Sequence, residues 1–250
     1  MRWLLGGILL GILALGLGYW LTRPALQERR EIFRGVWLEV ETGPRGGRSL
    51  LVEVHWDTPG VRLAHRPFSF PVNPRHPVAP HFRLWPADLL LAGSGAEVLI
   101  NTTIYAPADW RSVRPGLPVR SVETVVERGQ ASHIHEHSYL LYWDEAGKAR
   151  LLQQKPPPEA ALASAVLGIG LQGVQVAGGR PRYKALGSLK TVEDRSFIGI
   201  DPEGKVLYLL AMERTTGREM IDRAVAAGVW HGGQLDTGKA SHLLVGSGAK

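Results

Sequence analysis

The sequence predicts an α+β fold, in which a single domain of mixed or antiparallel sheet with a few packed helices is preceded by one N-terminal transmembrane helix. Short runs rich in valine, leucine and tryptophan outnumber the helical segments. Two of these runs form hairpin patterns around turn residues, at residues 142–152 and 197–211. Such hairpins favour an α+β domain over a regular alternation of parallel strands and helices.

An uncharged apolar stretch, residues 3–22, follows Arg2 and carries aromatic residues at both ends. At about 1.5 Å per residue, a helix of this length crosses a hydrocarbon core about 30 Å thick. We therefore expect residues 1–22 to be a transmembrane signal anchor. A cleaved signal peptide is the alternative, but its apolar region is normally shorter and a small-residue cleavage pattern follows it.

Charge predicts the segments after the anchor, and glycine spacing within the anchor indicates a helix contact. Residues 23–34 are charged and are expected to form a juxtamembrane linker or a short helix, and residues 35–250 form the globular domain. Within the anchor, Gly7 and Gly11 have the small-xxx-small spacing of helix contacts in membranes. This spacing suggests a weak homodimer.

The composition of the chain narrows the possible functions. There is no cysteine, which excludes disulfides, thiol catalysis and cysteine-ligated zinc. The formal net charge of +6 suggests anionic partners such as phosphate-bearing polymers or lipid headgroups. Because no dense basic run with interleaved aromatic residues is present, nucleic acid is not an expected partner.

Turn and cap signals place the remaining elements. The pattern predicts a hairpin at residues 35–56, a long irregular loop at 65–80, a helix from Pro86 and a buried strand at 96–105. It also predicts a helix at 156–168 and another at 215–229. In the second of these helices, Thr216 and Glu219 have the spacing of a capping box.

Three histidines, His133, His135 and His137, alternate along a segment expected to be a strand over residues 133–143. On a strand that rises about 3.3 Å per residue, the first and third histidines are about 13 Å apart. Zinc–nitrogen bonds are only about 2.0–2.1 Å long, so the three side chains cannot share one ion. A metal held by His133 and His135 with a further ligand is a weak alternative, and the expectation is that no metal or other cofactor is used.

Two other clusters carry polar groups at the ends of apolar runs. The run before Asn101 ends in that asparagine, two threonines and an aromatic residue. The sequence LDTGKAS at residues 235–241 places Asp236 before a turn of small residues, where backbone amides, Lys239 and Ser241 could hold an oxyanion or phosphate. An ordinary turn is the alternative interpretation of the second cluster.

In their order along the chain, these segments resemble the phosphodiester glycosidase family. Members of that family have a strand ending in NGGFF, a late hairpin of the form R-[ST]-x-IG-[IV], a helix, and then NLDGGGSS before a strand. The counterparts here are NTTIY at 101–105, RSFIGIDPEGKV at 195–206, the helix after Thr216 and QLDTGKASHLLV at 234–245. The resemblance implies a hydrolase that removes a sugar from a sugar-1-phosphodiester.

The resemblance also implies roles for individual residues. Asp236 is expected to act as base or nucleophile, Arg195 to bind phosphate and Asn101 to bind sugar hydroxyls, with Asp194 as a reserve acid. Further substrate and phosphate contacts are expected from one set of residues: Gly238, Lys239, Ser241 and Tyr105.

This sequence departs from the family pattern at its glycines. The replacements are Thr102 and Thr103 in the first motif, and Thr237, Lys239 and Ala240 in the last. Glycines let a backbone approach a ligand closely, so their loss changes the pocket or removes activity. A non-catalytic envelope protein that binds glycan or phosphate therefore remains an alternative, as does a metal-dependent hydrolase.

The charges that flank the expected anchor slightly favour a cytoplasmic body. The resemblance implies the opposite orientation, because family members act outside the cytoplasm, and we therefore expect an anchored, single-pass protein whose main domain faces the cell envelope. The expected partners are a phosphate-bearing glycan or sugar phosphate, and the membrane through the N-terminal helix. The positive charge of the chain suits such polymers.

Overall fold

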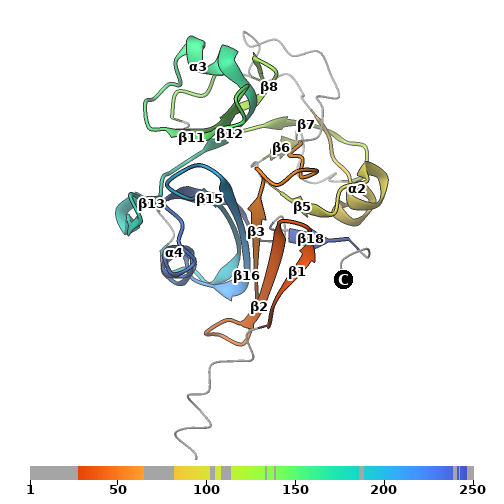
Figure 1. The fold of residues 1–250 in the computed structure, drawn as a ribbon, viewed down its shortest axis with the longest axis vertical. Coiled ribbons are helices and arrows are strands. Elements are labelled where there is room, and N and C mark those ends of the chain that lie inside the picture. Colours follow the sequence, from red (N-terminus) through yellow and green to blue (C-terminus); the bar gives the residue numbers. More distant parts are fainter. Residues whose placement is uncertain are drawn as a thin grey trace, which may run out of the picture.

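In the computed structural model, antiparallel strands dominate the described part of the chain (Figure 1). The structure describes residues 28–64, 82–101, 105–107, 114–132, 134–137, 139–185, 189–238, 241 and 243–246, with only the backbone described at 105–107. The α+β prediction is therefore wrong, because the described residues form four antiparallel sheets and only three short α-helices of eight, six and ten residues.

The main sheet has eight strands in the order β1-β2-β3-β16-β15-β17-β13-β14. Its strands are β1 (Glu28–Phe33), β2 (Val36–Thr42), β3 (Arg48–His55), β16 (Val206–Thr215), β15 (Glu193–Ile200), β17 (His231–Thr237), β13 (Val176–Ala177) and β14 (Arg180–Pro181). The predicted hairpins β2–β3 and β15–β16 are both present and pair directly with each other through β3 and β16. Four adjacent strands of the main sheet thus come from two local hairpins joined edge to edge.

A five-stranded sheet of order β11-β10-β12-β8-β9 lies across one end of the main sheet (Figure 1). Its strands are β11 (Ala149–Leu152), β10 (Tyr139–Asp144), β12 (Ala165–Leu171), β8 (Val125–Glu127) and β9 (Gln130–Ala131). Two small sheets complete the fold, one of β5 (Val98–Ile100) with β18 (Leu243–Val245) and one of β4 (Phe82–Arg83), β7 (Pro118–Ser121) and β6 (Tyr105–Pro107). The β5–β18 pair brings the end of the chain beside the strand that leads to Asn101.

The helices are α2 (Ala87–Ser94), α3 (Glu159–Ser164) and α4 (Gly217–Ala226), with a 3₁₀ turn at Tyr183–Ala185. The capping box predicted for α4 is confirmed, since the Glu219 amide donates to the Thr216 hydroxyl at 3.2 Å and the Thr216 amide donates to the Glu219 carboxylate at 2.8 Å. Beyond the cap, α4 buries Met220 and Ile221 against the main sheet. This local signal and its apolar face explain why the helix was predictable.

Two segments differ from the sequence prediction in their secondary structure. The helix predicted at 156–168 ends at Ser164, and residues 165–171 form β12, which hydrogen-bonds to β10 on one side and to β8 on the other. Residues 28–33, expected in a linker or short helix, form β1 at the edge of the main sheet. In both cases, pairing with a neighbouring strand outweighed the local pattern.

The histidine segment is also shorter as a strand than predicted. The strand β10 begins at Tyr139; before it, residues 134–135 are irregular and residues 136–137 form a turn outside any sheet. His133 lies outside the described residues. The even strand spacing used to separate the histidines therefore does not apply to His135 and His137.

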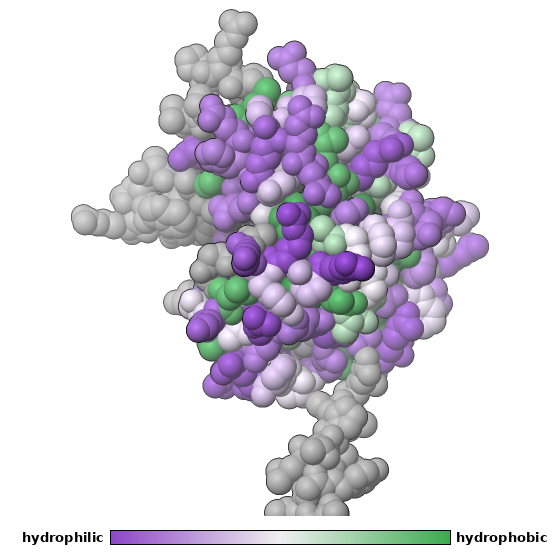
Figure 2. Space-filling view, turned by 90° about the vertical axis from the view of Figure 1, so that its left-hand side faces the viewer, coloured by the Kyte–Doolittle hydropathy of each residue, from purple (hydrophilic) through white to green (hydrophobic). Residues whose placement is uncertain are grey.

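The expected membrane anchor, residues 1–22, lies outside the described residues, as does the loop at 65–80. Among the helices that are described, none has the length and apolar character needed to span a bilayer. The face shown in Figure 2 is largely hydrophilic, with apolar side chains scattered between polar ones.

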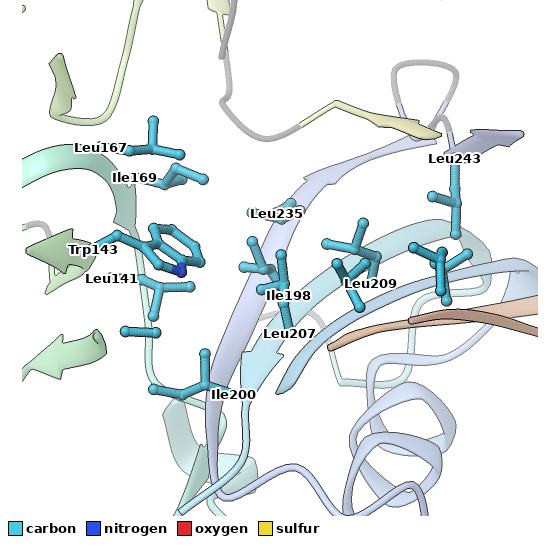
Figure 3. Close-up of a cluster of buried hydrophobic side chains, with 14 of the residues drawn as sticks. Leu141, Trp143, Leu167, Ile169, Ile198, Ile200, Leu207, Leu209, Leu235 and Leu243 are labelled. Atoms are coloured by element: carbon cyan, nitrogen blue, oxygen red, sulfur yellow. The ribbon is translucent and has the colours of Figure 1, made fainter. Parts of the chain in front are cut away.

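One hydrophobic cluster joins the two large sheets (Figure 3). The five-stranded sheet contributes Leu141, Trp143, Leu167 and Ile169, and the main sheet contributes Ile198, Ile200, Leu207, Leu209 and Leu235. Burial of each such side chain contributes about 1.5–3 kcal/mol. The shared cluster fixes the five-stranded sheet against β15 and β17, the two strands that carry the candidate site.

Leu141→Ala should lower the free energy of unfolding by about 2–5 kcal/mol, because its fully buried side chain lies in the cluster that joins both sheets. The measurement is chemical denaturation followed by circular dichroism. Val166→Ala, at a 44% exposed position of β12, is the control and should change the stability by less than about 0.5 kcal/mol. Equal effects of the two substitutions would contradict this assignment of the core.

Candidate functional site

Asn101 and Asp236, which are far apart in the sequence, come together at the end of the main sheet. Asn101 follows β5 and Asp236 lies near the end of β17. The Asn101 side-chain amide donates to the Asp236 carboxylate with an Nδ2–Oδ2 distance of 3.5 Å. The convergence follows from the β5–β18 pairing, because β18 comes a few residues after β17 in the chain.

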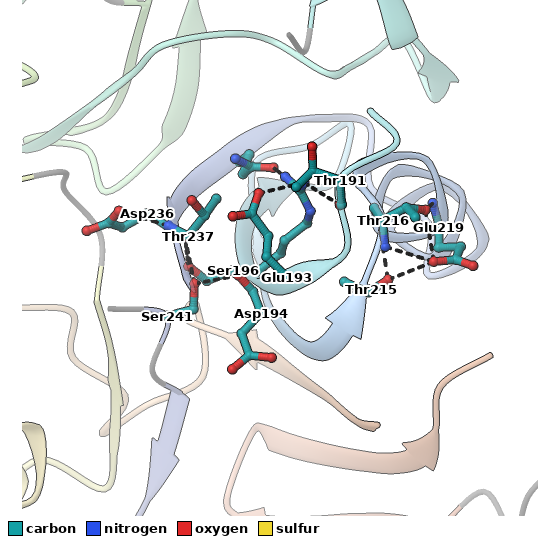
Figure 4. A network of polar contacts seen from close by, with 12 residues as sticks. Thr191, Glu193, Asp194, Ser196, Thr215, Thr216, Glu219, Asp236, Thr237 and Ser241 are labelled. Carbon is teal, nitrogen blue, oxygen red and sulfur yellow. Dashed lines mark hydrogen bonds and ion pairs between the residues drawn. The ribbon is translucent and has the colours of Figure 1, made fainter. Parts of the chain in front are cut away.

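The backbone around Asp236 is fixed by two serine hydroxyls (Figure 4). Ser196 and Ser241 both donate to the Asp236 carbonyl oxygen, at 2.9 and 2.8 Å. The Ser241 hydroxyl also lies 3.2 Å from the carbonyl oxygen of Asp194, so it links the ends of β17 and β15. These contacts leave the Asp236 carboxylate to interact with Asn101 and with the amide of Thr237, which donates to Oδ1 at 2.8 Å.

Arg195 is fully buried and points into the protein from β15. Its Nη1 donates to the side-chain oxygen of Gln234 at 2.6 Å, and its Nη2 donates to the carbonyl oxygen of Thr191 at 2.9 Å. The same Nη2 forms an ion pair with Glu193 at 2.6 Å. Burial lowers the pKa of Arg195, and the negative charge of Glu193 opposes this effect.

Asp194 has a structural contact that separates it from Asp236. Its carboxylate accepts a hydrogen bond from the amide of Arg214 at 2.9 Å, where the β15–β16 pairing has a bulge and Arg214 adopts a positive φ of 49°. A bulge leaves a backbone amide outside the regular ladder, and Asp194 satisfies it. The structure thus places Asp194 at the bulge and Asp236 with Asn101.

The electrostatic environment of Asp236 favours its protonated form. Burial raises the pKa of Asp236, and the negative charge of Glu193 raises it further, while the hydrogen bonds from Thr237 and Asn101 act in the opposite direction. A carboxyl group whose pKa is raised in this way is a stronger base once it is ionised.

Three residues of this arrangement were missed from the sequence: Thr191, Glu193 and Gln234. The strand pattern carried the signal for one of them, because Glu193 and Arg195 are two residues apart in β15 and share a face of the strand. Gln234 comes from the neighbouring strand, so its contact with Arg195 depends on the β15–β17 register.

The other predicted site residues are only partly described. Gly238 has a positive φ of 67°, and a Cβ built there would meet nothing within 4 Å. Ser241 takes part in the backbone contacts above, but Lys239 lies outside the described residues. Tyr105 begins β6, of which only the backbone is described.

One contact in the structure bears on the alternative of a metal held by His133 and His135. The His135 Nδ1 lies 3.8 Å from a carboxylate oxygen of Glu123, which is buried. Within the described part of the chain, no group of three or more histidine, aspartate or glutamate side chains could hold a metal ion. His133 is outside that part.

Comparisons with known proteins find similarity of structure only. No family model and no curated protein matches the sequence. A hypothetical protein from Synechocystis has a TM-score of 0.56 at 13% identity, covering 90% of this chain and 60% of that protein. The present chain therefore spans 60% of the length of that relative.

Two further solved structures are similar over most of the chain. The catalytic domain of zebrafish N-acetylglucosamine-1-phosphodiester alpha-N-acetylglucosaminidase has a TM-score of 0.50 at 12% identity, covering 91% of this chain and 80% of its own. A Burkholderia pseudomallei protein described as exported has a TM-score of 0.54 at 12% identity, covering 84% and 71%. At these identities, the likeness establishes a shared fold.

Asp236→Asn should alter how stability depends on pH. Since the pKa of Asp236 is raised in the folded protein, the folded state binds more protons than the unfolded chain, and wild-type stability falls as pH rises through the folded pKa. The variant lacks this titration, so its stability relative to wild type should increase from about pH 4 to pH 7. Denaturation at several pH values measures this difference, and a difference that stays constant would count against the burial of Asp236.

Proposed function

We propose that this protein is a hydrolase that removes a sugar from a sugar-1-phosphodiester. The observation that carries the proposal is the contact of Asn101 with a partly buried Asp236, on a fold similar to that of a phosphodiester glycosidase domain. Both residues stand at the positions that the family motifs suggested from the sequence. A partly buried carboxylate beside an amide donor suits attack at an anomeric carbon.

The proposed reaction needs one carboxylate and a site for the leaving phosphate. Asp236 would take a proton from a water molecule whose oxygen attacks the anomeric carbon, while the bond from that carbon to the phosphate oxygen breaks and its electron pair leaves with the phosphate. In a second form of the reaction, Asp236 itself attacks and water later releases the sugar. The phosphate leaves as a weakly basic anion, so a strong general acid is not required.

The phosphate-binding role proposed for Arg195 needs revision. Its side chain is fully buried, and its donors are directed at Gln234, Thr191 and Glu193. We therefore assign Arg195 to holding the site together and assign the phosphate to the backbone and side chains of the turn at 237–241. The glycine retained there, Gly238, has a positive φ of 67°, a backbone conformation that favours glycine.

We place the reaction outside the cytoplasm, on phosphate-bearing glycans of the cell envelope. The support is the fold shared with a protein described as exported, together with the net positive charge of the chain. The membrane anchor at residues 1–22 and a homodimer through Gly7 and Gly11 remain predictions from the sequence.

A glycan-binding protein without activity is the second candidate function. It is favoured by the burial of Arg195, which removes one cation from the predicted phosphate site, and by Thr237 in place of a family glycine. Such a protein would keep the fold and the positive surface but would not depend on Asp236.

Release of free sugar from a synthetic sugar-1-phosphodiester tests the proposal. Wild type should turn the substrate over, and Asp236→Asn should lower kcat by about 10²- to 10⁴-fold, because it removes the carboxylate base. Asp57→Asn, the same change at an exposed aspartate after β3, is the control and should retain full activity.

The other outcomes separate the alternatives. Binding of a phosphate-bearing glycan without turnover by wild type would favour the glycan-binding protein. Loss of activity on addition of a chelator and in His135→Ala would favour the metal-dependent hydrolase.

A further inference from the structure

An exposed tryptophan lies on the turn of the β13–β14 hairpin, at one edge of the main sheet. The Trp230 side chain is 40% exposed, although it is large and apolar. Its ring lies against Gly179, where an added Cβ would be 3.1 Å from Cε3 and 3.2 Å from Cζ3. Gly179 also has a positive φ of 69°, so both the backbone conformation and the close approach of the ring favour glycine there.

Hydrogen bonds and one ring contact fix the position of Trp230. Its amide donates to the carbonyl oxygen of Ile200 at 2.8 Å, and its carbonyl oxygen accepts from the amide of Gly179 at 3.0 Å. The ring of His231 contacts the indole edge to face, with centroids 6.2 Å apart and an interplanar angle of 71°. The exposed side of the indole is therefore a preorganised surface, which a ligand can contact at a low cost in side-chain entropy.

Two arginines follow the turn on the same hairpin. Arg180 pairs with Ala177, and Ala177 pairs with His231, so the side chains of Arg180 and His231 lie on one face of the sheet. Arg182 comes two residues after Arg180, and its amide donates to the carbonyl oxygen of Gln175 at 2.7 Å. Both arginines are exposed, and neither forms an ion pair within the described part of the chain.

The acidic side chains of the adjoining segments have other partners. The Asp201 carboxylate accepts hydrogen bonds from two backbone amides of its own turn, and Asp222 of α4 accepts from the hydroxyl of Tyr183. Burial lowers the pKa of His231, which favours its neutral form. The positive charge of the hairpin therefore comes from the two arginines and is available to a ligand.

This hairpin is distant from the candidate site. Trp230 precedes β17, whereas Asp236 lies near the end of that strand. At about 3.3 Å per residue, the two residues are about 20 Å apart along the strand. The β13 strand lies at the left of Figure 1, and Figure 2 shows that this side of the molecule is largely hydrophilic. A ligand that contacts both places must be longer than one sugar unit.

We propose that Trp230, Arg180 and Arg182 form a second binding site, which holds a phosphate-bearing glycan chain away from the candidate site. The C–H face of a sugar ring is apolar and slightly positive, so it packs on the negative face of an indole. A guanidinium binds phosphate oxygens through paired, charge-assisted hydrogen bonds. The combination fits a chain in which sugars alternate with phosphates.

The class of ligand rests on the proposed function, but binding at this site does not require turnover. A long chain that reaches Asp236 would also contact Trp230, and two contacts on one chain increase its apparent affinity. The second site should therefore lower KM for a polymer and leave the reaction of a single unit unchanged.

The test compares two synthetic probes on the full chain, a linear polymer of hexose 1-phosphate units and a single sugar-1-phosphodiester. Trp230→Ala should weaken binding of the polymer about tenfold, as for loss of a central aromatic contact, and leave kcat/KM on the single unit unchanged. Trp230→Phe keeps an aromatic ring and should retain most of the affinity. Trp85→Ala is the matched control, because Trp85 is 41% exposed and lies just before α2, outside the hairpin.

Arg180→Gln tests the charge of the site. It should also weaken binding of the polymer about tenfold and make the binding less sensitive to salt. An affinity that is unchanged in Arg180→Gln overturns the assignment of a phosphate-bearing ligand.

Three results overturn the second site: no binding of the polymer by wild type, unchanged affinity in Trp230→Ala, or equal losses in Trp230→Ala and Trp85→Ala. If wild type turns over neither probe but its binding of the polymer depends on Trp230 and Arg180, the proposed function fails and the second site stands.

Discussion

The burial of Arg195 is the constraint on which the candidate site depends. A guanidinium removed from water must be paired and hydrogen-bonded, because an uncompensated buried charge is very costly. Glu193, Gln234 and the Thr191 carbonyl provide those partners, and they come from β15, from β17 and from the segment before β15. The hydrogen bond to Gln234 depends on the observed register of the two strands.

That register also determines the surroundings of Asp236. The alignment that places Gln234 beside Arg195 places Asp236 at the end of β17, where the serine hydroxyls hold its backbone and Asn101 reaches its carboxylate. The ion pair of Arg195 and the carboxylate of Asp236 therefore lie on one strand pair.

Local signals in the sequence were sufficient to predict the elements whose hydrogen bonds join residues that are close together in the chain. The capping box of α4, the hairpin β15–β16 and the helix after Pro86 were predicted because each depends on residues a few positions apart. The strand β12 was not predicted, because the alanine-rich residues before it favour a helix, and its partner β8 lies some forty residues earlier in the chain.

The same distinction applies to the candidate site. Asn101 and Asp236 could be chosen from motifs. The ion pair of Glu193 depends on where the Arg195 side chain points, and the sequence contains no information on that orientation beyond strand alternation. Arg195 itself shows the limit of a motif, because an arginine at a motif position can bind a substrate anion or satisfy an internal carboxylate. Burial decides between these roles.

A glycine of β17 connects the polar contacts around Arg195 to the rest of the fold. A Cβ at Gly233 would lie 2.3 Å from the carbonyl oxygen of Gly173 and 3.0 Å from the side-chain oxygen of Gln175. Only glycine allows the segment after β12 to approach β17 this closely, and this approach lets Gln175 bind the amide of Gln234. The five-stranded sheet, through β12 and the segment that follows it, therefore supports the contact of Gln175 with Gln234, the residue that accepts from Arg195. The core that joins the two sheets and the network behind the candidate site are parts of one packing arrangement.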